Sequence, residues 1–432
     1  MQSLLEDLWL YQKNQDSRAL AEAEALLAAE DESTRRQAAN RFVRCVLAEA
    51  AQHDFRKNLW QSCVTYYIAA NENAFSLREE RRQETADETS CGKDPFARHD
   101  CSLLRRLFSV ELAAEAQKPG AEVLAALADY EPFLRAGSAE GTQIETLRQR
   151  LEEAADDEAF YDEICRFYRN HGVGMFGMYQ AFTLAAERGA VRLQPITRGG
   201  AETLDDLIGY EVQKEMLTAN TEAFVQGKPA NNVLLYGDGG TGKSTSIRAL
   251  LHRYGGDGLR IIQVYRHQMQ YLPEVISEIT NRKYRFLIYM DDLSFEDFET
   301  EYKYLKAVIE GGLEPRPENV LVYATSNRRH FIKETWNDRR DEEHNGEIFR
   351  SDSLEEKRSL ADRFGLQIYY GKPTKEEYHR IVEALAAREG LRCSKEALHA
   401  EATKWEIRYG GVSGRSARQF IDYMKGMENE TR

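Results

Sequence analysis

The feature that most constrains the fold is a glycine-rich octapeptide between a short apolar run, 232–236, and a helical run, 244–254. Glycines allow positive φ angles and let backbone N–H groups approach an anion, and the following helix adds the positive end of its dipole. The octapeptide fits G-x-x-x-x-G-K-[ST] in the strand–loop–helix context that this pattern requires, so it predicts a phosphate-binding loop. Its residues are Gly237, Asp238, Gly239, Gly240, Thr241, Gly242, Lys243 and Ser244, followed by Thr245.

Two pairs of side chains suit a nucleoside triphosphate with a divalent ion. Lys243 is placed to reach the β- and γ-phosphates, and Ser244 supplies a hydroxyl for Mg²⁺. A second apolar run, 285–291, ends in Asp291 and is followed by Asp292. Because a carboxylate at the carboxyl end of a parallel strand lies in the ligand crevice of an open sheet, we expect Asp291 to hold Mg²⁺ through water and Asp292 to face the attacking water. Capping of a helix is the competing role for this acidic pair.

Short apolar runs alternate with helical segments in the C-terminal half. Continuous apolar runs of this kind are typical of parallel strands covered on both faces. The pattern predicts an α/β core with a parallel five-stranded sheet. The expected strands are 232–236, 259–265, 285–291, 319–326 and 366–370.

Helical periodicity dominates both ends of the chain, because apolar residues recur there at three- and four-residue spacing. We expect a helical N-terminal domain over 1–195, a nucleotide-binding core over 203–372 and a helical lid over 373–432. An aromatic and methionine cluster over 161–182 is interpreted as part of a core or a domain seam, with a binding surface as the alternative. The expected helices are 17–30, 35–52, 56–84, 97–117, 121–135, 141–155, 157–170, 374–389, 394–408 and 413–428.

Composition limits the class of protein. The formal net charge of −14 argues against a protein that coats nucleic acid or an anionic membrane, since both need a basic surface. No apolar run approaches the 18 or so residues that a membrane-spanning helix needs, and the N-terminus has no signal-peptide pattern. The six cysteines form no CxxC pair, which favours reduced thiols. These features together predict a cytoplasmic protein.

Taken together, these motifs resemble an AAA+ ATPase, and residues 203–425 resemble an uncharacterised bacterial family labelled domain of unknown function 815. The resemblance implies ATP and Mg²⁺ as cofactors, ATP hydrolysis, and a homo-oligomer in which an arginine acts on a neighbour's nucleotide. It assigns Ile208 and Gly209, within 206–210, to an adenine pocket, and Asn327, at the end of 319–327, to a sensor that orients water. It assigns Arg363, within 360–365, to the arginine finger. Arg415, within 411–418, is assigned to the sensor of the lid, with Arg418 as the alternative.

The sequence departs from the family pattern at Asp292, where AAA+ motors usually carry glutamate. A carboxylate one methylene shorter reaches less far, so we expect slow or partner-dependent hydrolysis. The predicted function is a slow ATP-driven switch, or a remodelling or loader factor, acting on a protein partner that the N-terminal domain recruits. The alternatives are a non-hydrolysing ATP-gated scaffold, a P-loop kinase of small molecules, and a helicase loader, although the acidic balance argues against direct nucleic-acid binding.

Structural roles compete with the functional ones at several positions. Arg363 could form a salt bridge with Asp362, Arg415 could be an exposed charge of the lid, and Asn327 could cap its strand. Two segments have no assigned chemistry. The acidic stretch 334–357, with a net charge of 4 − 9 = −5, is either a solvated loop or an element that responds to partner or nucleotide. The cluster Arg328–His330 could contact phosphate, DNA or a neighbouring subunit.

Overall fold

The structure is a computed structural model that describes residues 5–11, 18–82, 94–128, 130, 139–187, 190–197, 202–294, 302–310, 317–327, 360–391, 393–409 and 411–430. The chain forms two compact units, Met1–Tyr179 and Gln180–Arg432. Each unit has a hydrophobic core of its own.

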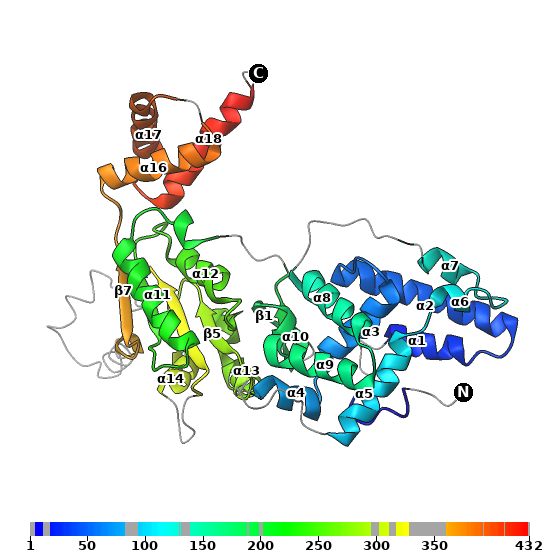
Figure 1. Cartoon of the computed structure of the whole chain (residues 1–432). Helices are drawn as coiled ribbons and strands as arrows, with labels where there is room; N and C mark the ends of the chain where they lie inside the picture. The colour runs from blue at the N-terminus through cyan, green and yellow to red at the C-terminus, as the bar shows by residue number, and fades with distance from the viewer. Residues whose placement is uncertain are drawn as a thin grey trace. The chain divides into compact units, whose positions relative to one another are not determined.

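The first unit is helical in its described residues (Figure 1). Side-chain caps define several of its helix ends; Asp31, for example, accepts the N–H of Thr34 at the start of the second helix and so satisfies a donor that the helix itself leaves unpaired. The helices are α1 (Arg18–Leu27), α2 (Glu32–His53), α3 (Leu59–Ala70), α4 (Ala74–Arg81), α5 (Pro95–Phe108), α6 (Leu112–Glu115), α7 (Val123–Ala128), α8 (Ala139–Glu153), α9 (Asp157–His171) and α10 (Gly174–Met178).

The single helix expected over 56–84 is wrong, because asparagines divide it into α3 and α4. Asn71 ends α3, and the Asn73 side chain accepts the N–H of Ser76. The Ser76 hydroxyl in turn accepts the N–H of Asn73. This capping box satisfies two backbone donors reciprocally and starts a new helix where periodicity alone predicted a continuous one.

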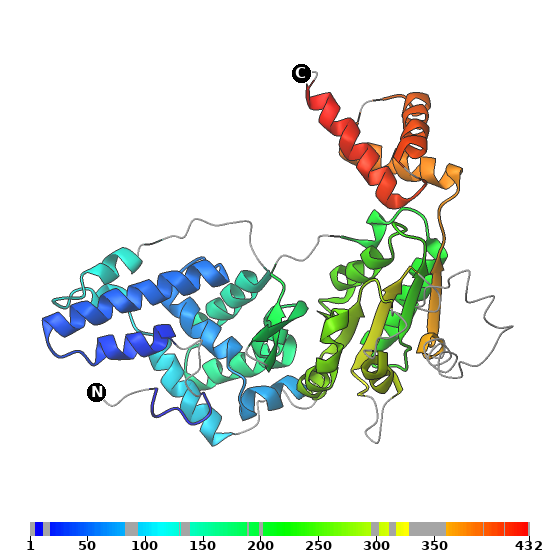
Figure 2. The ribbon, with the colours of Figure 1, turned by 180° about the vertical axis from the view of Figure 1, so that it is seen from behind.

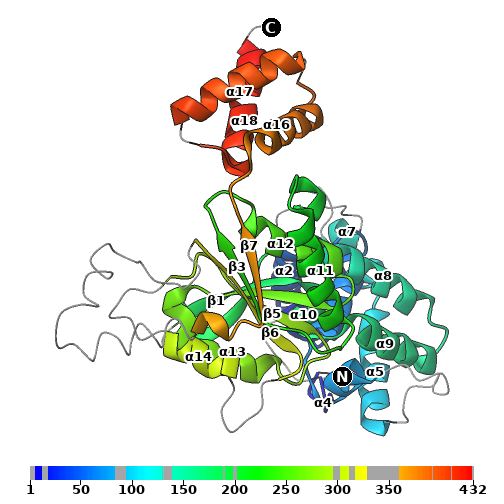
Figure 3. The same ribbon diagram turned by 90° about the vertical axis from the view of Figure 1, so that its left-hand side faces the viewer.

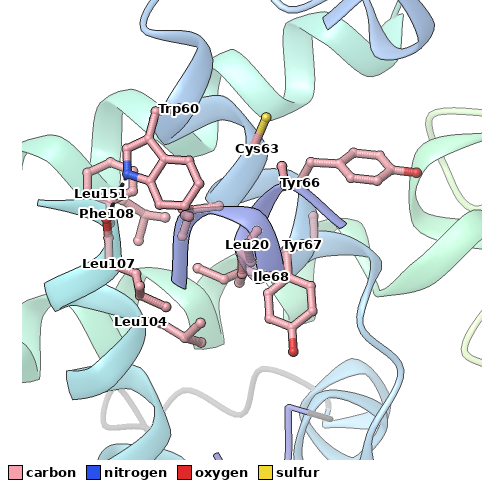
Figure 4. Close-up of a cluster of buried hydrophobic side chains, with 14 of the residues drawn as sticks. Leu20, Trp60, Cys63, Tyr66, Tyr67, Ile68, Leu104, Leu107, Phe108 and Leu151 are labelled. Atoms are coloured by element: carbon pink, nitrogen blue, oxygen red, sulfur yellow. Dashed lines mark hydrogen bonds between the residues drawn. The ribbon is translucent and has the colours of Figure 1, made fainter. Parts of the chain in front are cut away.

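Aromatic side chains fill the core of the first unit. Figure 4 shows Trp60 of α3 beside Leu107 and Phe108 of α5. The Trp60 indole is buried, and its N–H donates to the Leu107 carbonyl at 2.8 Å, so the polar end of the ring is satisfied as well. The cluster over 161–182 contributes Tyr161, Phe167, Tyr168 and Met178 to the same core, which confirms its interpretation as core.

The second unit is built on a seven-stranded sheet, so the predicted count of five strands is wrong. The five expected strands lie in the order β4-β5-β6-β3-β7 and are parallel. Two more strands extend this sheet: β1 pairs with β4 in parallel, and β2 pairs with β1 antiparallel. The strands are β1 (Ala181–Glu187), β2 (Ala190–Pro195), β3 (Val233–Gly237), β4 (Leu259–Gln263), β5 (Arg285–Met290), β6 (Val320–Ser326) and β7 (Leu366–Tyr370).

Strands β1 and β2 come from residues that we expected in the helical N-terminal domain. Ala185, Ala186 and Glu187 are good helix formers, so their local preference is against a strand. Antiparallel pairing of 185–187 with 190–192 of β2 overrides that preference, and parallel pairing of 181–183 with 261–263 of β4 joins the hairpin to the sheet.

Helices cover both faces of the sheet. Figure 3 shows α11 and α12 on one side and α13 and α14 on the other. Alternate strand residues such as Val233, Leu235 and Tyr323 pack with α11 and α12. Strand β3 lies between β6 and β7, so the loop at its carboxyl end adjoins the ends of both neighbours. The covering helices are α11 (Glu211–Val225), α12 (Lys243–Tyr254), α13 (Leu272–Ile279) and α14 (Tyr302–Glu310), with 3₁₀ turns η2 (Leu204–Asp206) and η3 (Arg266–Tyr271).

Three helices follow β7 and form a small bundle (Figures 1 and 2). They are α16 (Lys375–Glu389), α17 (Lys395–Tyr409) and α18 (Gly414–Glu430). Their core contains Tyr378, Val382, Leu398 and Phe420, and Ile208 from the segment before α11 packs against it. The bundle therefore contacts the chain that leads into the α/β core.

Two expectations drawn from composition can be compared with the described residues. None of their helices combines the length and the apolarity that a membrane crossing requires. Cys45, Cys63, Cys101 and Cys393 are free thiols, as expected. Cys165 is disulfide-bonded, so the expectation of reduced thiols is wrong at that position.

Candidate functional site

The glycine-rich loop joins the carboxyl end of β3 to the first turn of α12. Gly237 has a φ of 133°, and a Cβ there would lie 2.2 Å from the Tyr370 carbonyl oxygen of β7. Gly240 has a φ of 78°, a left-handed value that favours glycine. The predicted residues 237–245 thus form one continuous loop and helix start, in which Thr245 lies in the first turn of α12.

Lys243 is buried beneath this loop with all three ammonium protons engaged. Its Nζ donates to the carbonyl oxygens of Gly237 at 2.9 Å and Asp238 at 2.7 Å, and to Asn327 Oδ1 at 3.0 Å. Burial lowers the pKa of the ammonium, although the carboxylates of Asp238, Asp292 and Asp291 act in the opposite direction. The Lys243 ammonium therefore lies at the loop and is held by neutral oxygens, which a charged acceptor such as phosphate can replace.

A hydroxyl and a carboxylate meet where α12 approaches the end of β5. Ser244 Oγ donates to Asp291 Oδ1 at 2.6 Å, and Thr325 Oγ1 of β6 donates to the same oxygen at 2.7 Å. Partial burial acts to raise the pKa of Asp291, but these hydrogen bonds outweigh it and hold the pKa below its ordinary value. Asp291 is therefore a carboxylate at neutral pH.

Asp292, the second acid of the pair, has a left-handed backbone, with a φ of 51°. Its N–H donates to Thr325 Oγ1 at 2.9 Å, and its carboxylate accepts from Asn327 Nδ2 at 2.7 Å. Asn327 thus links the Asp292 carboxylate to the Lys243 ammonium. Aspartate tolerates this conformation better than most residues, and the surrounding hydrogen bonds maintain it.

The residues present fit a magnesium ion. Hydroxyl and carboxylate oxygens are the ligands that Mg²⁺ prefers, and the ion usually keeps several of its waters. Beside Ser244 and Asp291 lies the buried hydroxyl of Tyr289, which is close enough to Asp291 to help lower the pKa of that carboxyl but makes no hydrogen bond of good geometry with the described residues. Burial raises the pKa of Tyr289, so its hydroxyl stays protonated. A water of a magnesium shell would donate to the oxygen of this hydroxyl, and the site therefore suits a hydrated cation.

The segment before α11 lies between the phosphate loop and the lid. Leu207 packs against Gly242, where an added Cβ would lie 2.2 Å from the leucine Cδ1. Ile208 is half-buried against the lid core, and Gly209 has a φ of 81° with open space around it. Of the two predicted adenine-pocket residues, Ile208 therefore contacts the lid, next to Leu207 at the loop, and Gly209 borders open space.

The lid contacts the phosphate loop through the start of α18. The N–H of Arg415 donates to the Gly240 carbonyl at 3.2 Å. Arg418, the alternative to Arg415, instead pairs with Glu389 at 2.9 Å. Arg388 of α16 reaches Asp206 at 3.0 Å and also donates to the Asp205 carbonyl. The structure therefore places Arg415, rather than Arg418, at the loop.

Arg363 is the predicted residue that the structure does not bring to this site. It precedes β7, whereas the loop follows β3, and the two strands are parallel with Val233 opposite Leu366 and Gly237 opposite Tyr370. At about 3.3 Å per residue, β7 itself spans roughly 13 Å from Leu366 to Tyr370, and Arg363 lies three residues before it. Arg363 thus lies at the amino-terminal ends of the strands, whereas the loop lies at their carboxyl ends. It is too far away to touch a phosphate bound in its own loop.

Two predictions fall on residues outside those that the structure describes. These are the cluster Arg328–His330 and the acidic stretch 334–357. Their roles stay as stated from the sequence.

Sequence reasoning missed two hydroxyl groups of the site, Thr325 and Tyr289. Both lie on strands whose sequences are otherwise apolar, so each residue is easily interpreted as a core residue whose hydroxyl has no role. The available signal is periodicity: Tyr289 is two residues from Asp291 and Thr325 two from Asn327, so each pair shares a face of the sheet.

Three of the solved structures that are similar to this chain share 16–17% sequence identity with it. The Holliday junction branch migration motor RuvB of Thermotoga maritima is 16% identical over 53% of this chain and 66% of that chain, with a TM-score of 0.38. The AAA domain of FIGL-1 in complex with ADP is 17% identical over 54% and 76%, with a TM-score of 0.37. The replication initiator DnaA bound to AMPPCP and single-stranded DNA is 17% identical over 54% and 68%, with a TM-score of 0.35.

The chain spans just under two thirds of the RuvB chain. No curated protein matches it. The model of the family described as Protein of unknown function (DUF815) matches residues 177–428, which is more than half of the chain. This match begins just before β1 and takes in the phosphate loop, the acidic pair and the lid. The chain belongs to that family.

Proposed function

We propose that this chain is a Mg²⁺-dependent ATP-binding ATPase of the AAA+ type that acts as a slow switch on a protein partner. The observation that carries the proposal is the line of contacts from Lys243 through Asn327 to Asp292, beside the pair Ser244 and Asp291. Three separate segments bring these groups together. A purely structural role would not require a buried ammonium under a glycine loop next to two carboxylates.

Each residue has a role that follows from its position. The Lys243 ammonium can exchange its carbonyl partners for phosphate oxygens, which are charged and therefore stronger acceptors. Ser244 and Asp291 hold the cation, and Mg²⁺ when bound neutralises charge on the phosphates. Asn327 orients a water, and the Asp292 carboxylate can accept a proton from it. Ile208 and Gly209 contact the base between loop and lid.

The second acid favours slow turnover. Asp292 is short, and its carboxylate is already bonded to Asn327, so reaching a water requires rearrangement. The same observation supports the second candidate, a non-hydrolysing ATP-gated scaffold. Steady-state phosphate release by the lone protein separates the two: a slow release that Asp292→Asn removes supports the switch, and no release from the wild type supports the scaffold.

Calorimetry on the full chain tests the proposal as a whole. We expect adenosine triphosphate analogues that resist hydrolysis to bind in the presence of Mg²⁺, and more weakly with EDTA. No heat of association with well-folded protein would overturn the proposal. Turnover as fast as that of a processive motor would overturn only its slow-switch part.

We infer that Arg363 acts on the nucleotide of a neighbouring copy, which makes the protein a homo-oligomer when ATP is bound. Its place at the far edge of the sheet supports this, since its own loop is out of reach. A mixing experiment tests it. Lys243→Ala lacks nucleotide but supplies Arg363, whereas Arg363→Ala binds nucleotide but lacks the arginine. Each should be inactive alone, and a mixture should regain activity; no recovery in mixed oligomers would contradict action between subunits.

The partner is proposed to be a protein that the helical N-terminal region binds in the cytoplasm, where ATP is available. The acidic net charge supports a protein partner over nucleic acid. Capture with an Asp292→Asn form tests this, because a chain that binds but does not hydrolyse ATP holds a normally transient complex. A captured partner that the Lys243→Ala form also retains would show that binding is independent of ATP.

A further inference from the structure

Thr325 is a buried threonine near the end of β6, with 2% of its surface exposed. It shares a face of the sheet with Tyr323 and Asn327, because side chains alternate along a strand. This face is the one that α11 and α12 cover and that leads to the phosphate loop. Thr325 therefore projects between the loop and the acidic pair.

The hydrogen bonds of Thr325 fix the direction of its hydroxyl proton. The N–H of Asp292 can only donate, so Oγ1 must accept there, at 2.9 Å. The hydroxyl proton is then left for Asp291 Oδ1, at 2.7 Å. One hydroxyl thus bonds to the backbone of one acid and to the side chain of the other. A hydroxyl with a donor and an acceptor fixed in this way has no remaining freedom to rotate.

These bonds give the two neighbouring acids different partners. Asp291 Oδ1 receives two hydroxyl donors, from Ser244 and Thr325, which hold its carboxylate at the start of α12. The Asp292 carboxylate instead accepts from Nδ2 of Asn327, a residue that also contacts Lys243. The main chain reinforces this arrangement, since the Leu293 N–H donates to the Thr325 carbonyl at 2.7 Å. Without this anchor, two adjacent carboxylates would gain freedom to take other directions.

We propose that Thr325 is a positioning residue: it fixes Asp291 for the magnesium ion and Asp292 for water. The proposal rests on the proposed nucleotide site and adds a residue to it that motif reasoning does not assign. It requires a hydroxyl at this position rather than a side chain of a given size. Valine has nearly the same shape as threonine without the hydroxyl, and serine keeps the hydroxyl without the methyl group.

The test compares Thr325→Val, Thr325→Ser and wild type by calorimetry with a non-hydrolysable ATP analogue, with Mg²⁺ and with EDTA. Thr325→Val should lose about 10-fold or more of the affinity that Mg²⁺ adds, because it loses a hydrogen bond to a charged group. Its affinity in EDTA should stay within about 3-fold of wild type. Thr325→Ser should restore most of the magnesium effect. For phosphate release with Mg²⁺, the valine form should show a higher KM that follows its lost affinity, because KM approaches Kd when chemistry is slow, and a lower kcat as well; the serine form should restore both.

Thr221→Val is the matched control. Thr221 is also buried, and its hydroxyl also bonds twice, to the Leu217 carbonyl and to Tyr323, but it lies on α11 away from both acids. It should lower thermal stability without changing the magnesium effect. If Thr325→Val fails to fold, Thr325→Ala and Thr325→Ser make the same comparison, since they differ in the hydroxyl alone.

The outcomes separate this proposal from the one on which it rests. A wild type that binds no nucleotide overturns the proposed function itself. A wild type with a clear magnesium effect, which folded Thr325→Val reproduces, overturns the role of Thr325 alone. A magnesium effect lost equally in the valine and serine forms also overturns it, because the hydroxyl would then not be the cause.

Discussion

Replacing Lys243 by alanine separates nucleotide binding from folding. The ammonium makes three hydrogen bonds, but all three acceptors are neutral oxygens of the loop and of Asn327. Burial already lowers its pKa, so removal of the charge relieves part of the desolvation penalty. Alanine is also the best helix former for the first position of α12. We therefore expect the folded protein to persist, with a loss of no more than about 1–3 kcal/mol.

The effect on binding should be much larger. Hydrogen bonds from a cation to phosphate contribute about 1.5–3 kcal/mol each, so two of them account for about 3–6 kcal/mol, or roughly 10²- to 10⁴-fold in Kd. Calorimetry with Mg²⁺ and an ATP analogue measures this, with circular dichroism to establish folding.

The control is Lys228→Ala, the same change at an exposed lysine that precedes β3 at the opposite edge of the sheet. It should leave the affinity unchanged. A folded Lys243→Ala protein within about 5-fold of wild type would refute the reasoning, since 5-fold is only about 1 kcal/mol.

Three further predictions concern stability. Gly237→Ala should lower the free energy of unfolding, measured with urea, by about 2–5 kcal/mol, because the φ of 133° and the approach to the Tyr370 carbonyl both exclude a Cβ. An unchanged urea midpoint would show that the loop relaxes to accept the methyl group. Burial raises the pKa values of Tyr323 and Tyr370 to about 12, so the neutral phenols stabilise the fold fully below pH 10, and this stabilisation is lost as the pH rises toward 12. The urea concentration at the unfolding midpoint should therefore be lower at pH 11 than at pH 8. Tyr323→Phe should reduce this difference, because it removes one of the two groups. Arg388→Ala should lower stability by less than about 1 kcal/mol, because both side chains of its ion pair with Asp206 are substantially exposed; a loss above 2 kcal/mol would contradict this.

The core strands and the phosphate loop could be predicted because their signals are local. Strands buried on both faces read as continuous apolar runs, and β5, β6 and β7 lie within a residue or so of the expected ranges. The meeting of Ser244 and Asp291 follows from topology, since parallel strands present their carboxyl ends at one edge.

The features that were missed depend on contacts between distant parts of the chain. Strand β1 pairs with β2 along most of its length and with β4 at its start, and these contacts override the helical preference of its own alanines. Thr325 becomes notable only when Asp291 and Asp292 lie next to it. The distance of Arg363 from the loop likewise depends on the parallel register between β3 and β7, which composition does not encode.

The left-handed turn at Asp292 also bears on why a shorter acid occurs there. Aspartate and asparagine accept positive φ more readily than longer side chains, since their polar groups bond locally. Side-chain length at 292 is then governed by main-chain torsion and not only by chemistry at the terminal phosphate. In the proposed ATPase, an engineered glutamate would gain reach but lose conformational fit, so faster hydrolysis would need a relaxed turn as well as a longer acid.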